Sequence, residues 1–357
     1  MATSSPLDRA DLRHRVSTAL RDCLARQRPR LDAISPNLRP LVDALTAFLL
    51  DGGKRLRPAF AYWGWRGAGG RDSDEIVTAV SALEWVQACA LIHDDVMDGS
   101  DTRRGQPAMH RRFATLHRGS DWLGDADGFG TAMAILLGDV CLIWADEVLN
   151  TSGLPTEALL RGQPVYDEMR TEIMAGQYLD VLGQVTGDDS VADAMTVVRY
   201  KSAKYTVERP LHLGAALAGG PPELMAAYSE YGLPVGEAFQ LRDDVLGVFG
   251  DPAETGKPAG DDLREGKRTV LVAEALTNAS PSQAAQVRRR LGDPRLDAEG
   301  VAVLREIIVE TGALDAVERL VEQLVEEASL ALQRADVAEP ARAVLSELVE
   351  AATARQA

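Results

Sequence analysis

Hydrophobic positions along this 357-residue chain recur with the spacing of helices, and no stretch shows the alternating polarity of a hairpin. Abundant alanine and leucine, with only 5% aromatic residues, also favour helices over strands. The sequence therefore predicts an all-α fold. No linker-like stretch divides it, so one domain is expected over 1–357. Helices are expected over 12–50, with a break at Ser35 and Pro36, and over 75–97, 132–149, 165–185, 191–219, 301–311 and 314–333.

Glycine- and aspartate-rich stretches separate some of these helices. Residues 119–130 and 250–268 are predicted to be loops. Asp188 and Asp189 stand among turn residues and are predicted to cap the next helix. The helices from about 280 to 352 carry no motif and are expected to be scaffold.

Two acidic clusters interrupt the apolar pattern, DDVMD at 94–98 and QLRDD at 240–244. In a helix, Asp94 and Asp98 form an i,i+4 pair on one face, and Asp244 lies one turn after the glutamine of its cluster. A solvated helix face would explain a single cluster. Both clusters have apolar flanks, however, and buried carboxylates are costly unless a cation compensates them. Two such helices facing each other would form an oxygen-lined site for hard divalent cations, which bind a few carboxylates plus substrate phosphates.

Basic residues cluster although the formal net charge is −16. A glycine turn followed by cations, as in GGKRLRP at 52–58, suits a diphosphate. Any one basic cluster could be a surface ion pair, but the ordered set beside the acidic clusters predicts phosphate chemistry. The other clusters are RRGQP at 103–107, KSAK at 201–204, GKP at 256–258 and GKRT at 266–269.

From about residue 40 to about residue 275, these motifs in order resemble those of the trans-isoprenyl diphosphate synthases. The motifs are GGKRLRP, LIHDDVMD, RRGQP, GQYLD at 176–180, KSA and FQLRDD. The stretch KYTVERP at 204–210 further resembles the actinomycete-type farnesyl and geranylgeranyl diphosphate synthases. The resemblance implies a helical bundle around a central cavity, and condensation of isopentenyl diphosphate with an allylic diphosphate. It also implies three Mg²⁺ ions and a homodimer, whose surface would come from the apolar helices between 132 and 185.

The resemblance also assigns roles to residues. It implies metal binding by Asp94, Asp95, Asp98, Asp243 and Asp244. It implies allylic diphosphate binding by Arg103, Gln177, Lys201, Ser202, Gln240, Lys257 and Lys267. It implies isopentenyl diphosphate binding by Lys54, Arg57, Gln87 and Arg104.

The second acidic motif departs from the family at Gly247, where a third aspartate is common. Asp243 and Asp244 remain, so the metal site is expected to be weaker rather than lost. On this reading, Gly247→Asp should lower the magnesium concentration needed for half-maximal rate.

Product length should depend on what stands below the first acidic motif on its own helix. Cys89 and Ala90, five and four residues before Asp94, are small, whereas related enzymes that stop at fifteen carbons usually carry a large aromatic residue there. One turn deeper, Trp85 would close the cavity, unless it packs in the core away from it. This predicts geranylgeranyl diphosphate, C20, with C25 or longer and C15 left open. Cys89→Phe should then shorten the product and Trp85→Ala should lengthen it.

Composition narrows the remaining choices. The acidity argues against nucleic acid and anionic membrane surfaces as partners. No secretory signal is visible, no apolar stretch reaches the roughly 18 residues that a membrane span requires, and three cysteines lack metal-type spacing, so a cytoplasmic protein is expected. A terpene cyclase or a non-catalytic subunit of a heteromeric synthase remains as an alternative. A cyclase would not need the GGKRLRP site, and non-catalytic subunits usually lose an acidic motif.

Overall fold

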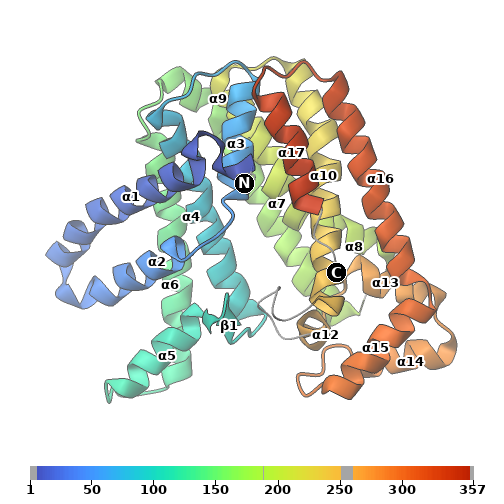
Figure 1. Ribbon diagram of the computed structural model, residues 1–357. Helices are drawn as coiled ribbons and strands as arrows, with labels where there is room; N and C mark the ends of the chain where they lie inside the picture. Colours follow the sequence, from blue (N-terminus) through green and yellow to red (C-terminus); the bar gives the residue numbers. More distant parts are fainter. Residues whose placement is uncertain (1–5, 188, 251–259, 354–357) are drawn as a thin grey trace, which may run out of the picture.

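Long helices running side by side make up most of the molecule, as the computed structural model shows for residues 6–187, 189–250 and 260–353 (Figure 1). The predicted all-α fold is confirmed. The first half contains α1 (Leu12–Ile34), α2 (Arg39–Leu50), α3 (Leu56–Gly67), α4 (Asp74–Met97), the two-stranded ribbon β1 (Thr102–Arg103) and β2 (Gln106–Pro107), α5 (Met109–Gly119) and α6 (Ala126–Asn150). The second half contains α7 (Thr156–Thr186), α8 (Val191–Val197), the π-helical segment η3 (Val198–Glu208), α9 (Arg209–Ala218), α10 (Pro222–Phe249), α12 (Asp261–Glu265), α13 (Val270–Asn278), α14 (Pro281–Arg290), α15 (Ala298–Glu310), α16 (Ala313–Arg334) and α17 (Ala341–Thr353).

Side-chain caps fix several helix ends where the sequence supplies a short polar residue. Asp125 accepts hydrogen bonds from the backbone amides of Asp127 and Gly128 and so starts α6 within the predicted 119–130 loop. Ser190, and not Asp189, caps α8 by accepting from Asp193 N at 3.3 Å. Asp188 lies outside the described residues. The predicted capping role of Asp189 is therefore wrong, and its carboxylate is used elsewhere.

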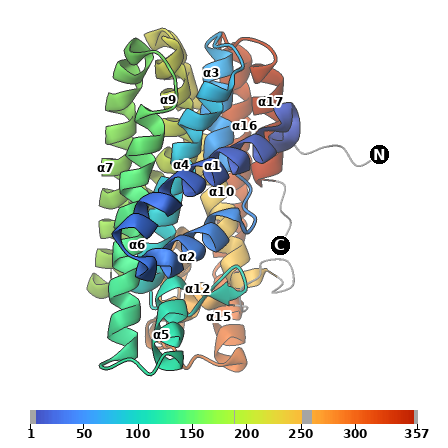
Figure 2. The same cartoon turned by 90° about the vertical axis from the view of Figure 1, so that its left-hand side faces the viewer.

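Two hydrophobic cores meet at α10. The larger core joins α1, α3, α4, α6, α9 and α17, and it includes Val235 near the middle of α10. The second core joins α13, α15 and α16, and it includes Leu241 and Val245 further along α10. The second acidic motif therefore lies where the two cores adjoin, on a helix that both hold in place. Figure 2 shows α10 behind α1 and α2, between α4 and α16.

Helices α3 and α9 approach until their backbones touch. A Cβ atom on Gly64 would lie 2.9 Å from Leu211 Cα, and one on Gly214 would lie 2.5 Å from the backbone nitrogen of Trp65. Only glycine allows this approach. Helix α3 follows the GGKRLRP turn, and α9 follows η3, which contains the KSAK cluster. The contact between α3 and α9 therefore holds these two basic segments at a fixed separation.

Two helices, α4 and α6, are long and apolar enough to cross a membrane by length and composition. This corrects the prediction that no stretch reaches that length. The most apolar 18-residue window of α4 is 72% buried inside the molecule, which is typical of a core helix. In α6 the corresponding window is 39% buried, because part of its apolar surface faces outward.

Candidate active site

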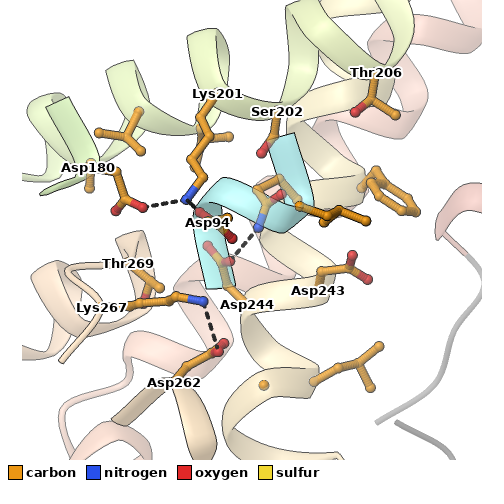
Figure 3. Close-up of a pocket in the computed structure, with 18 of the residues that line it drawn as sticks. Asp94, Asp180, Lys201, Ser202, Thr206, Asp243, Asp244, Asp262, Lys267 and Thr269 are labelled. Carbon is orange, nitrogen blue, oxygen red and sulfur yellow. Dashed lines mark hydrogen bonds and ion pairs between the residues drawn. The ribbon is translucent and has the colours of Figure 1, made fainter. Parts of the chain in front are cut away.

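A cavity of about 1010 Å³ opens between α4, η3 and α10, beside the segment that follows α12 (Figure 3). Its size is at the upper end for ligand pockets. Among the predicted site residues, its lining includes Lys54, Arg57, Gln87, Asp94, Arg103, Lys201, Ser202, Gln240, Asp243, Asp244 and Lys267. Lys257 lies outside the described residues.

The first acidic motif presents Asp94 to the cavity. Gln177 Nε2 donates to Asp94 Oδ1 at 2.8 Å, and Lys201 Nζ lies 3.4 Å from the same oxygen. Burial opposes ionisation of Asp94, but Lys201, Lys267 and Arg103 outweigh it, so the pKa of this carboxyl lies below its ordinary value. Gln177 does not line the cavity itself and acts on this carboxylate.

Asp98 follows Asp94 by one turn and is more deeply enclosed. Its side chain is 3% exposed, and its Oδ1 atom has no hydrogen-bond partner among the described residues. Burial, and then the negative charge of Asp94, raise its pKa to about 6. An enclosed carboxylate oxygen without a donor is suited to meet a cation.

Asp95 differs from its neighbours and requires a correction. It is fully buried, lies outside the cavity lining, and accepts two hydrogen bonds on Oδ1 from Arg103, at 2.7 and 2.5 Å. A helix turns by about 100° per residue, so Asp95 cannot share the face of Asp94. Asp95 therefore positions Arg103, which does line the cavity, instead of binding metal as predicted.

The second acidic motif presents Asp243 and Asp244 from α10. Gln240 Nε2 donates to Asp244 Oδ1 at 2.7 Å across one helical turn. Burial, and then the charge of Asp262, raise the pKa of Asp244 to about 8. At neutral pH and without metal, this carboxyl therefore holds its proton.

That shift predicts how stability depends on pH. Between about pH 4 and pH 8 the native state keeps the Asp244 proton that the unfolded state has lost, so the unfolding free energy of the metal-free protein falls as pH rises. Asp244→Asn lacks this dependence. Relative to the variant, the wild type should lose up to about 1.4 kcal/mol per pH unit across that range. Urea denaturation at several pH values measures the difference, and a pH-independent gap between the two proteins would contradict it.

Lys267 lies between carboxylates of the first acidic motif and of α12. Its ammonium group is 2.8 Å from Glu265, 3.6 Å from Asp262 and 3.8 Å from Asp98. Burial disfavours its charge, but these carboxylates raise its pKa above the ordinary lysine value. Lys267 therefore stays charged and can attract an anion into this half of the cavity.

The opposite side of the cavity carries Lys54, Arg57 and Gln87. The Arg57 guanidinium lies 4.3 Å from the centre of the Tyr205 ring and donates to Thr206 Oγ1 at 2.8 Å. The Gln87 amide oxygen is buried and has no hydrogen-bond partner among the described residues.

Two arginines near this side do not line the cavity. Arg55 turns into the core and pairs with Glu84 and the Leu49 carbonyl. Arg104 also lies outside the lining, beside Gly53, and donates to the Asp51 carbonyl at 3.3 Å. It is nevertheless next to the turn that carries Lys54.

Several cavity residues were not predicted. Asp180 accepts a hydrogen bond from Lys201 Nζ at 2.5 Å. The sequence could have indicated it, because Asp180 follows Gln177 by three residues on α7 and so lies on the same helix face. Arg268 also lines the cavity and is held by Asp189 at 2.7 Å. The remaining unpredicted polar lining residues are Thr206, Asp262 and Thr269.

Gly247 lies against a carboxylate from another helix. A Cβ atom at this position would overlap the Asp262 side chain, lying 2.6 Å from its carboxylate carbon. Gly247→Asp would therefore displace Asp262 rather than add a carboxylate to an open space. The expectation that this substitution lowers the magnesium requirement stays a prediction, and it now requires the Asp262 side chain to move aside.

The predicted product-length residues lie away from the cavity described here. The cavity meets α4 at Gln87, Leu91 and Asp94. Cys89 and Trp85 lie on the other side of this helix, fully buried, with Trp85 packed edge-on against Trp144 of α6 at 5.3 Å.

The effects expected from Cys89 and Trp85 therefore lose their structural basis. The alternative prediction, that Trp85 packs in the core away from the cavity, is correct. Ala90 is partly buried and also outside the lining.

The carboxylate oxygens of the cavity are the type of ligand that magnesium prefers. Among the described residues, however, no three acidic, histidine or cysteine side chains lie close enough together to bind a metal ion by themselves. Mg²⁺ usually keeps several waters and is bound by one or two carboxylates plus substrate phosphates. Asp94 on α4 and Asp243 and Asp244 on α10 line one cavity, which suits ions completed by a bound diphosphate.

The carboxylates on two helices, with lysines between them and a separate cationic side, define a helical enzyme site for diphosphate substrates. Residues 39–308 match the polyprenyl synthetase family. Geranylfarnesyl diphosphate synthase from Aeropyrum pernix is 36% identical over 290 residues, which cover 79% of this chain and 84% of the relative. Geranylgeranyl diphosphate synthase from Saccharolobus solfataricus is 30% identical over 277 residues, 77% and 78% of the two chains.

A solved structure is similar over nearly the whole chain. It is geranylgeranyl pyrophosphate synthase from Corynebacterium glutamicum, complexed with isoprenyl diphosphate and magnesium. The TM-score is 0.92 at 45% identity, covering 96% of this chain and 98% of that one. The chain belongs to the polyprenyl synthetase family. It is a chain-elongating trans-prenyltransferase of isoprenoid biosynthesis.

Proposed function

We propose that this enzyme condenses isopentenyl diphosphate with an allylic diphosphate in a magnesium-dependent reaction and releases geranylgeranyl diphosphate. The observation that carries the proposal is the two-sided cavity. Asp94, Asp244 and Lys201 lie on one side, and Lys54 and Arg57 lie on the other. Two diphosphates can bind there without sharing the same cations.

The reaction needs no protein nucleophile. The allylic carbon–oxygen bond breaks, the double bond of isopentenyl diphosphate attacks the allylic cation, and a proton then leaves the new chain to form the product double bond. Mg²⁺, held by Asp94, Asp98, Asp243 and Asp244, would supply positive charge to the departing diphosphate. Lys201, held by Asp180, would donate to the same diphosphate, with Arg103 and Lys267. Three ions are proposed from the family resemblance.

Incubation of the purified protein with isopentenyl diphosphate, each allylic diphosphate and magnesium tests this function. Consumption of both substrates with release of inorganic diphosphate is expected. A cyclase would release diphosphate without consuming isopentenyl diphosphate, and a non-catalytic subunit would consume neither. Either result would reject the proposal.

The C20 product is supported by the names of similar proteins, since the structure at 45% identity is a geranylgeranyl pyrophosphate synthase. C25 is the runner-up, because a relative at 36% identity is a geranylfarnesyl diphosphate synthase. Chromatography of dephosphorylated products should show mainly the C20 alcohol. A main peak at C15 or C25 would overturn the choice of product.

The isopentenyl diphosphate side can be tested separately. Lys54→Ala and Arg104→Ala should each raise the Michaelis constant for isopentenyl diphosphate by about tenfold or more, since hydrogen bonds to charged groups contribute roughly 1.5–3 kcal/mol. The Michaelis constant for the allylic substrate should change little. Steady-state kinetics with each substrate varied in turn measures both constants, and equal effects on the two substrates would reject the assignment.

A homodimer is proposed from the outward face of α6 and α7. Ile143 on α6 and Leu160, Tyr178 and Val185 on α7 are each more than 60% exposed. A soluble protein rarely leaves so many large apolar side chains in water, and a second copy of this chain would cover them. Ile143→Glu with Leu160→Glu should shift the protein to monomer in analytical ultracentrifugation. A wild-type monomer at micromolar concentration would reject the dimer.

The remaining proposals concern location and organisation. A cytoplasmic enzyme acting on small isoprenoid diphosphates, with no nucleic acid partner, agrees with the net charge of −16 and the three buried free cysteines. One domain over 1–357 is supported by α10, which contributes to both hydrophobic cores.

A further inference from the structure

Arg55 lies between Lys54 and Arg57 in the sequence, but its side chain does not reach the cavity. Lys54 and Arg57 line the cavity, whereas Arg55 is buried and lies outside the lining. The backbone of Arg55 is left-handed, with φ at 54°. This conformation is uncommon for a residue other than glycine, and it persists only where the surrounding structure holds it. The side chain of Arg55 must therefore be firmly anchored.

Glu84 of α4 is the partner that anchors Arg55. The Arg55 guanidinium donates to the Glu84 carboxylate through one terminal nitrogen and to the Leu49 carbonyl, at 2.5 Å, through the other. The two charged side chains are 4% and 8% exposed. Loss of one partner from such a buried pair leaves an uncompensated charge in the core, which is strongly destabilising. The Arg55–Glu84 pair therefore ties the turn before α3 to both α2 and α4.

Glu84 also offsets repulsion between cations near this turn. A Cβ atom on Gly53 would lie 3.5 Å from Arg55 Nη1 and 3.6 Å from Arg104 Nη2, so the two guanidinium groups are neighbours. Like charges held this close oppose each other's ionisation. Burial lowers the pKa of Arg104, and the negative charge of Glu84 is the largest influence against that shift. One buried carboxylate therefore keeps two guanidinium groups beside the turn that carries Lys54.

The other residues of this side also lie near Glu84. Gln87 follows Glu84 by three residues on α4, shares its helix face and lines the cavity. The Arg57 guanidinium lies over the ring of the buried Tyr205. Burial raises the pKa of the Tyr205 hydroxyl, the positive charge of Arg57 opposes this shift, and the negative charge of Glu84 adds to it. Glu84 therefore lies close to the residues that place both Lys54 and Arg57.

We propose that Glu84 is a positioning residue for isopentenyl diphosphate and acts through the buried side chain of Arg55. Anchoring Arg55 fixes the backbone on both sides of it, so that Lys54 and Arg57 face the cavity before the substrate arrives. Two cations arranged in advance bind a diphosphate without the cost of ordering the turn. Neither Glu84 nor Arg55 lines the cavity, so both act without touching the substrate. This inference rests on the proposed function, because that function assigns isopentenyl diphosphate to this side.

The alternative role of the Arg55–Glu84 pair is to stabilise the core alone. In that case its removal would lower stability and would affect the two substrates alike. A positioning role affects only the side of the cavity that carries the turn. The Michaelis constants for the two substrates therefore separate these roles.

Arg55→Met with Glu84→Leu removes both charges together, so no unpaired charge remains in the core. The Michaelis constant for isopentenyl diphosphate should rise by about tenfold, because the hydrogen bonds of the two cations to the diphosphate are no longer aligned. The Michaelis constant for the allylic diphosphate and the turnover number should stay within about twofold of the wild type. Steady-state kinetics with each substrate varied in turn measures all three. An unchanged constant for isopentenyl diphosphate, or an equal rise for both substrates, would overturn the proposal.

Arg15→Met with Asp72→Asn is the control, because it also removes one pair of opposite charges. Arg15 on α1 pairs with Asp72 at 2.9 Å, and neither residue lines the cavity. Both Michaelis constants of this control should stay within about twofold of the wild type. If the control raised the constant for isopentenyl diphosphate as much as the loss of the Arg55–Glu84 pair does, the proposal would be rejected.

Arg55→Lys keeps the test decisive if the double variant folds poorly. The lysine retains the balance of charge in the core, but its ammonium group cannot reproduce the planar fork that joins Glu84 to the Leu49 carbonyl. This variant should raise the Michaelis constant for isopentenyl diphosphate by about threefold or more and leave the allylic constant unchanged. Circular dichroism checks that it is folded. A folded Arg55→Lys variant with the wild-type constant for isopentenyl diphosphate would also overturn the proposal.

The proposed function fails in a different way. If the wild type consumes no isopentenyl diphosphate with any allylic diphosphate, the enzyme activity is wrong. If the wild type condenses both substrates but loss of the Arg55–Glu84 pair leaves the constant for isopentenyl diphosphate unchanged, only the role of Glu84 is wrong.

Discussion

Replacing Asp94 or Asp243 by asparagine should lower the turnover number by about two to three powers of ten. Each change removes one negative charge from the proposed magnesium site while keeping the side-chain volume. Groups that stabilise charge developing in the transition state contribute roughly 3–4 kcal/mol each. Release of inorganic diphosphate at saturating substrates and magnesium measures the loss.

Asp101→Asn is a suitable control. Asp101 lies close to the first acidic motif in sequence, but its side chain is 71% exposed and pairs with Arg111 at 2.6 Å outside the cavity. This variant should keep turnover within about a factor of two, because exposed ion pairs contribute little. Near-normal turnover of Asp94→Asn would show that the cavity between α4 and α10 is not where the diphosphate leaves.

The second large effect concerns stability. Gly214→Ala should destabilise the protein by roughly 1–3 kcal/mol or more, because the added methyl group would enter the backbone of α3. The new Cβ atom would lie 2.5 Å from Trp65 N, and backbone atoms cannot move aside as a flexible side chain can. Denaturant unfolding followed by circular dichroism measures the change.

Gly183→Ala provides the same chemical change in a helix with open space around it. Gly183 lies within α7, and a Cβ atom there would meet nothing within 4 Å. It should leave stability unchanged or raise it by up to about 1 kcal/mol, the helix preference of alanine over glycine. If Gly214→Ala behaved like Gly183→Ala, the close approach of α3 and α9 would be wrong.

The acidic and basic motifs could be predicted because their spacing has a direct structural meaning. Asp94 and Asp98 are one turn apart, and Gln87 precedes Asp94 by two turns, so a helix must bring them to one face. Gln87 and Asp94 do line the cavity, whereas the buried Asp98 side chain lies outside the lining. The predicted all-α fold followed from the same periodicity.

The face of α4 that borders the cavity could not be predicted from periodicity. This helix is apolar on nearly all sides, so the Cys89 side and the Leu91 side look alike in the sequence. Only packing against α6 shows that Trp85 and Cys89 belong to the core. The assignment of Cys89 and Trp85 to the cavity floor failed at this step, whereas the C20 product does not depend on it.

Asp262 was missed for a different reason. Its place in the cavity lining depends on contact between α12 and α10, which no local pattern encodes. The sequence showed Gly247 as a missing carboxylate, but only the tertiary structure shows that the Asp262 side chain lies against it.

The π-helical segment η3 has a consequence for how this enzyme can change during evolution. Its hydrogen bonds join residues five apart, so Lys201 and Thr206 both reach the cavity, which an α-helix would not allow at that spacing. Removing one residue between Ser202 and Thr206 would leave Lys201 and Thr206 four residues apart, the spacing that an ordinary α-helix places on one face. Both side chains would then still reach the cavity. A change of one residue in chain length could therefore exchange the π-helical segment for an α-helical one without separating the two substrate sites.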